Sequence, residues 1–148
     1  MESRSVSIAW KIMMIPNFAI WLFGLLFTFV PDAMNSLGFE SMTGQSWSAF
    51  VSANPKIADY ILLTDGRIAG VHLLAIAILS LAITLTSFRK GERWSWYALL
   101  ITLTLMITFE TVALLIMGQA SVAIINVVLL LIVYLALGIS AKDILRKK

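Results

Sequence analysis

Charged side chains are scarce in this chain. Only 13% of its 148 residues are charged, whereas 60% are hydrophobic and the mean hydropathy is +0.94. A water-soluble domain carries about 25% charged residues, so this chain has roughly half the charge needed to cover a surface that faces water. The composition therefore predicts a membrane protein, and it excludes a soluble enzyme and a secreted disulfide scaffold.

Several chemistries are excluded by residue types that the chain lacks. It contains no cysteine and one histidine. Without cysteine there is no disulfide, no thiolate nucleophile and no Cys-based zinc or iron–sulfur site, and one histidine is too few for a three-histidine metal centre. The sequence has no phosphate-binding glycine loop, nucleophile elbow or zinc signature. Its formal net charge of +3 comes from few charges rather than a basic groove, so no nucleic-acid partner is expected.

Four apolar segments are long enough to cross a bilayer, whose hydrocarbon core requires about 20 mostly apolar residues in a helix. The predicted spans are residues 12–30, 68–88, 94–117 and 121–140. We therefore predict one all-α domain over residues 1–148, an integral membrane four-helix bundle. The links after the second and third spans are short, which predicts that the spans they join are antiparallel neighbours.

The first and second spans are joined by a long outer loop, residues 31–67. Asn54-Pro55 predicts a helix start, since Asn favours the N-cap and Pro the first helical position, and we expect a short separate helix over residues 56–63. Ahead of it, Trp47 and the apolar residues that follow share one face of a turn. The loop is therefore interpreted as an amphipathic cap at the membrane surface.

Basic residues are distributed unequally between the two ends of the predicted bundle. Nine of the eleven lie in the N-terminal segment, the link after residue 88 and the C-terminal segment, and only Lys56 and Arg67 lie in the outer loop. Over short loops, such an excess of Lys and Arg marks the cytoplasmic side. We therefore predict a multi-pass protein of the cell membrane, in contact with membrane lipids, with both termini in the cytoplasm.

Polar residues lie deep in three of the predicted spans. Glu110, the one acid within a predicted span, lies about 10 Å below the outer end of its segment at about 1.5 Å per residue, and His72 and Asn126 lie at comparable depths. A charge in a bilayer costs at least about 2.5 kcal/mol and therefore needs a partner or a role. The hypothesis is an outward-opening pocket lined by these three residues, with Arg67 and Asp65 at its mouth.

This polar layer has several interpretations. The residues can hydrogen-bond each other and lock the bundle, or they can bind a hydrophobic small molecule, a lipid or a quinone. The chain can also be an accessory subunit beside another membrane protein or form a homo-oligomer. An enzymatic alternative gives Glu110 and His72 acid and base roles on a lipid-like substrate, and a transport alternative makes Glu110 a proton carrier. No residue is assigned as catalytic and no metal is expected.

Short motifs in the chain resemble small four-span membrane proteins of the DoxX-like type, found in bacteria and archaea. The motifs are Phe29-Val30-Pro31-Asp32, Gly66-Arg67-Ile68-Ala69-Gly70-Val71-His72 and Phe88-Arg89-Lys90-Gly91-Glu92-Arg93-Trp94. The resemblance implies a four-helix membrane fold, and DoxX proteins are associated with quinone-linked sulfur oxidation and redox defence. This chain has no cysteine, so thiol chemistry is not expected of it.

Overall fold

The computed structural model describes residues 3–146, and over that range its regular structure is helical throughout. Four of its helices are long and apolar enough to cross a membrane, and they mark the chain as a membrane protein. The four helices are Arg4–Phe29, Pro55–Phe88, Arg93–Ile116 and Ala120–Leu145. This confirms the predicted all-α architecture with four candidate spans.

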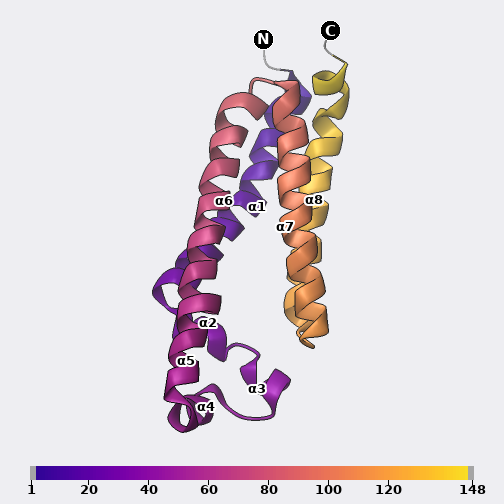
Figure 1. Ribbon diagram of the computed structural model, residues 1–148. Coiled ribbons are helices and arrows are strands. Elements are labelled where there is room, and N and C mark those ends of the chain that lie inside the picture. Colours follow the sequence, from indigo (N-terminus) through magenta and orange to yellow (C-terminus); the bar gives the residue numbers. More distant parts are fainter. Residues whose placement is uncertain (1–2, 147–148) are drawn as a thin grey trace.

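Two ends of the bundle are distinguished by what they carry. Figure 1 shows both ends of the chain and the turn before α7 (Arg93–Ile116) at one end, here called the termini end. The segments between the first and second spans lie at the opposite end, here called the loop end. Each span therefore runs antiparallel to the span that precedes it in the chain.

Three of the spans lie close to where they were predicted. The first and the last of them extend beyond the predicted limits at the termini end. The first, α1 (Arg4–Phe29), begins earlier than predicted because the side chain of Ser3 accepts a hydrogen bond from the backbone N–H of Val6. α7 agrees with the prediction to within one residue at each end. The last span, α8 (Ala120–Leu145), continues past its predicted end into the basic C-terminal segment.

The second span differs from the prediction. The elements α5 (Pro55–Ile61), η1 (Leu62–Ile68), α6 (Ala69–Ile83) and η2 (Thr84–Phe88) follow one another without a break. They form one helix of 34 residues, about 51 Å long at 1.5 Å per residue. The predicted start after Asn54 is confirmed. The predicted separation of a short helix over residues 56–63 is wrong.

Gly66 does not interrupt this helix. Gly66 lies in η1, a π-helical stretch in which the backbone widens locally while remaining helical. A Cβ at this position would lie 2.5 Å from the Cβ of Pro31, so the residue must be small for the start of α2 (Pro31–Ser36) to pack against it. The glycine serves a close approach between segments rather than a break in the helix.

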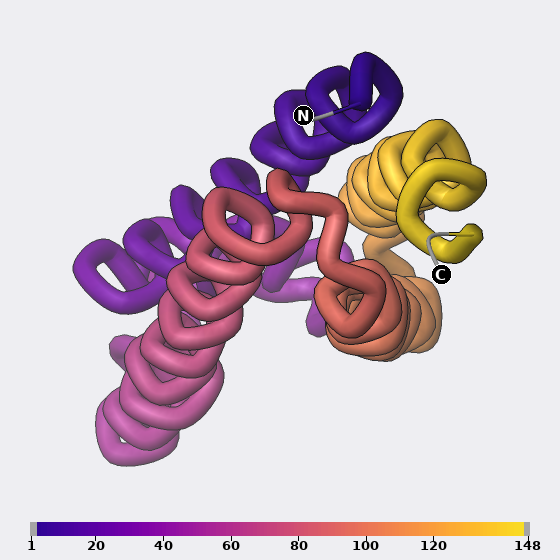
Figure 2. The backbone as a smooth tube through the Cα atoms, turned by 90° about the horizontal axis from the view of Figure 1, so that it is seen from above, coloured from indigo at the N-terminus to yellow at the C-terminus, as the bar shows by residue number. Residues whose placement is uncertain are grey.

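The spans do not pack equally. α1 packs along α6 and α8, and α7 packs along α8, whereas α6 and α7 make few contacts. Figure 2 shows α6 diverging from α7 away from the turn that joins them. The prediction that these two spans are close neighbours is therefore wrong for most of their length. The short link keeps the two spans close only at the ends that it joins.

Close backbone contact with α1 determines the direction of α6. A Cβ on Gly70 would lie 2.5 Å from Thr28 Oγ1, and one on Gly24 would lie 2.9 Å from the backbone nitrogen of Leu74. Gly24 and Gly70 therefore let α1 and α6 approach closely.

A buried polar group also fastens α1 to the second span. Asn17 has no exposed surface. Its Nδ2 donates to Met13 O at 3.0 Å and to Thr84 Oγ1 at 3.1 Å, and its Oδ1 accepts from Ser80 Oγ at 2.5 Å. Every polar atom of the amide therefore has a partner, as burial in an apolar environment requires.

The loop end has a small core of its own. It is built by α3 (Phe39–Thr43), α4 (Trp47–Ala53) and α5. Phe39, Trp47 and Ala58 are buried there, with Phe50 packed against them. Trp47 Nε1 also donates to Asp32 Oδ1 at 2.9 Å. The predicted apolar face that begins at Trp47 thus packs inside this cluster, which we call the loop cluster.

Candidate functional site

A cavity of about 410 Å³ lies in the half of the bundle nearer the loop end. It occupies the region where α6 diverges from α7, and its walls also include residues of α1, α8, η1 and the start of the loop. Its apolar lining residues are Ile20, Phe23, Phe27, Met34, Leu37, Ala69, Leu73, Met106, Ile107, Ala113, Leu114, Met117, Val122, Ile125 and Leu129. Small-molecule sites in proteins have volumes of about 300–1,000 Å³ and similarly apolar walls.

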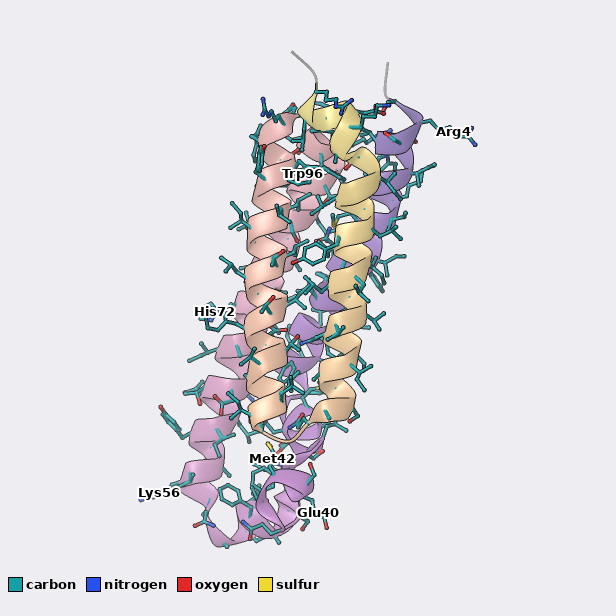
Figure 3. All side chains as sticks on the ribbon, turned by 90° about the vertical axis from the view of Figure 1, so that its right-hand side faces the viewer. Arg4, Glu40, Met42, Lys56, His72 and Trp96 are labelled. Atoms are coloured by element: carbon teal, nitrogen blue, oxygen red, sulfur yellow. The ribbon has the colours of Figure 1, made fainter. Side chains whose placement is uncertain are left out.

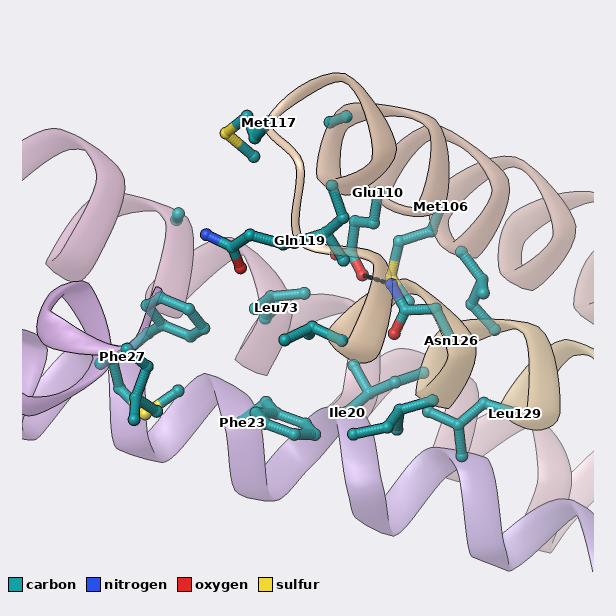
Figure 4. A pocket seen from close by; sticks show the side chains of 18 of the residues that line it. Ile20, Phe23, Phe27, Leu73, Met106, Glu110, Met117, Gln119, Asn126 and Leu129 are labelled. Carbon is teal, nitrogen blue, oxygen red and sulfur yellow. Dashed lines mark hydrogen bonds between the residues drawn. The ribbon is translucent and has the colours of Figure 1, made fainter. Parts of the chain in front are cut away.

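The polar side chains of the wall are few. They are Asp65, Glu110, Gln119 and Asn126. Glu110 on α7 and Asn126 on α8 are half-buried, and Asn126 Nδ2 donates to Glu110 Oε2 at 3.5 Å. Figure 4 shows this contact at the cavity wall, with Met106 beside it. Glu110 and Asn126 therefore lie side by side in the cavity wall.

Asp65 also reaches the cavity, from the π-helical stretch η1 on the opposite wall. It is exposed, whereas Glu110 is half-buried, so Asp65 lies at the mouth and Glu110 farther inside. Arg67 is exposed and is absent from the wall. Residues two positions apart on a helix do not face each other, which separates Arg67 from the side occupied by Asp65.

His72 does not share the site. Its side chain is exposed, and Figure 3 shows it pointing outward from the bundle. The neighbouring Leu73 lines the cavity in its place. The predicted pairing of His72 with Glu110 is wrong because the contacts of Gly66 and Gly70 fix the rotation of α6 and turn Ala69 and Leu73 inward.

One polar residue of the wall was not predicted. Gln119 lies in the tight turn between α7 and α8, and its Nε2 donates to Met42 Sδ at 3.3 Å. The contact links that turn to α3. The sequence did contain a signal for Gln119 as a site residue. It is a lone amide in an otherwise apolar turn, at the same end of the bundle as Asp65.

The arrangement offers hydrogen bonding within an apolar enclosure. A carboxyl group and two amides can hold one polar head group, while the surrounding Phe, Met, Leu and Ile side chains accommodate a hydrocarbon chain. Residues 3–146 contain no group of three or more His, Asp or Glu side chains that could hold a metal ion.

Comparison with known proteins adds no relative: no family model, no curated protein and no solved structure matches the chain. The DoxX-like resemblance accordingly stays a prediction.

Proposed function

We propose that this membrane protein binds a hydrophobic small molecule, a lipid or a quinone, in the cavity between α1, α6, α7 and α8. The observation that carries the proposal is an apolar cavity of about 410 Å³ whose wall includes the hydrogen-bonded side chains of Glu110 and Asn126. Apolar walls favour a hydrocarbon chain because they remove it from water, and the few polar groups fix its orientation. The quinone is included because the DoxX-like resemblance implies it.

The packing of the spans supports entry from the bilayer. Because α6 and α7 make few contacts, the cavity lies where the ring of helices is least closed. An amphiphile already in the membrane reaches such a site by lateral movement, without first passing through water.

The same proposal includes an orientation. The termini end carries most of the basic residues of the chain, so it faces the cytoplasm by the positive-inside rule. The cavity and the loop cluster then belong to the outer half of the membrane. The site would receive molecules from the outer leaflet.

The test is extraction and mass spectrometry of small molecules that copurify with the protein. Two variants fill the cavity from opposite walls, Ala69→Phe on α6 and Ala113→Phe on α7. The matched control is Ala75→Phe, at an exposed position of α6 that does not line the cavity.

The wild type and the control should carry a stoichiometric amphiphile, and both filled variants should lose most of it while keeping the same thermal unfolding midpoint. A wild type that carries no stoichiometric small molecule would overturn the proposal. So would filled variants that retain the molecule as fully as the control.

A further inference from the structure

The ionisable side chains in the cavity wall are all acids. Asp65 and Glu110 contribute two carboxyl groups, and Gln119 and Asn126 contribute neutral amides. Among the described residues that line the cavity there is no Lys, Arg or His. The nearest sequence candidates for a counter-charge, Arg67 and His72, are exposed and outside the wall.

Glu110 also has little internal compensation. Its one hydrogen-bond partner in residues 3–146 is Asn126, at the long end of the hydrogen-bond range. An ionised carboxyl group accepts about four hydrogen bonds, so most of this capacity remains for a ligand. A carboxylate in apolar surroundings is costly unless it is paired.

These observations discriminate between head groups. An anionic head would meet two carboxyl groups and no basic side chain. A neutral hydroxyl would use an acceptor but would supply no counter-charge to an ionised carboxyl group. A positively charged amine supplies both a hydrogen-bond donor and the missing counter-charge.

We propose that the cavity is selective for an amphiphile with a positively charged amine head group, held by Glu110. This inference rests on the proposed function and names the ligand class of the same site. Asp65 at the exposed mouth meets the cation first, and Glu110 holds it farther inside, against α7 and α8. The hydrocarbon chain lies among Phe23, Leu73 and Met106, which Figure 4 shows around the same space.

The experiment uses three photoreactive probes with the same long alkyl chain and a diazirine. One ends in a primary ammonium group, one in a hydroxyl and one in a carboxylate. Each is added to the full chain in liposomes, and mass spectrometry of the digested protein locates the labelled peptides. We expect the cationic probe to label the cavity walls about tenfold more than either other probe. A hydrogen bond between charged groups favours binding by a free energy that corresponds to about this ratio.

Variants test whether Glu110 is responsible for the selectivity. Glu110→Gln should lower labelling by the cationic probe to the level of the hydroxyl probe, and Glu110→Asp should restore part of it. Glu40→Gln is the matched control, because Glu40 is an exposed acid on α3 outside the cavity wall. If Glu110→Gln fails to fold, the Asp65→Asn variant, at an exposed position, serves in its place and should lower labelling by severalfold.

The outcomes separate the two proposals. Cavity labelling that is equal for the hydroxyl and cationic probes, or that is unchanged in the folded Glu110→Gln variant, would overturn the amine selectivity and leave the proposed function standing. If no probe labels the cavity walls, the proposed function itself is wrong.

Discussion

Asn17 uses both ends of its side-chain amide between α1 and the second span. It bonds to Thr84 and Ser80, and it has no exposed surface. Replacing it with an apolar residue of similar size removes both interhelical hydrogen bonds in surroundings where water cannot replace them. Asn17→Leu should therefore lower the free energy of unfolding by about 1–2 kcal/mol.

The measurement is reversible unfolding in mixed detergent micelles. The control is Thr86→Val, because the Thr86 hydroxyl is exposed and donates within its own helix to Ala82 O. A loss as large in Thr86→Val as in Asn17→Leu would show that the interhelical bonds contribute nothing specific. Asn17 lies next to Pro16 in α1, and its hydrogen bonds anchor that helix to the second span.

At the scale of helices, glycine contacts decide how α6 lies. A Cβ on Gly70 would meet Thr28 Oγ1 at 2.5 Å and the backbone nitrogen of Thr28 at 2.6 Å. Backbone atoms cannot move aside as the end of a flexible side chain can, so Gly70→Ala should force α6 away from α1. We expect it to lower the free energy of unfolding by about 1–3 kcal/mol.

Gly138 provides the matched control, because it lies in α8 and a Cβ there would meet nothing within 4 Å. Gly138→Ala should leave the unfolding free energy unchanged or raise it by about 0.4–1 kcal/mol, since alanine favours helix. Thermal unfolding followed by circular dichroism would check both variants. Equal midpoints for the two would contradict the close packing of α1 against α6.

These same contacts explain which elements could be predicted from sequence. The third span and the first residues of the fourth agree with prediction because length and hydropathy decide them. The continuous second span could not be predicted, because Asp65-Gly66 is a stop signal in the local sequence. The packing of Pro31 on Gly66 explains why a glycine lies there within a helix.

The candidate site could be predicted only in part from the sequence. Depth along a helix follows from counting residues, so Glu110 and Asn126 were expected in one layer and do meet. Rotation about the helix axis does not follow from counting. For His72 it is set by the glycine contacts of α6, and the residue faces outward.

At the scale of the whole molecule, the proposed orientation gives a direct test, since the chain has no cysteine to remove. Ser48→Cys, on α4 at the loop end, should react with a membrane-impermeant maleimide in intact cells. Lys90→Cys, in the turn at the termini end, should react only after lysis, and both positions are exposed. Reaction of Lys90→Cys alone in intact cells would reverse the orientation.

The divergence of α6 from α7 also gives the molecule a taper. Figures 1 and 2 show the spans gathered at the termini end and spread apart toward the loop end. The protein consequently occupies a larger cross-section in one leaflet than in the other. A bilayer adapts its shape to an embedded protein at modest cost, so a wedge of this form is accommodated best where the membrane curves with the loop-end leaflet on its convex side.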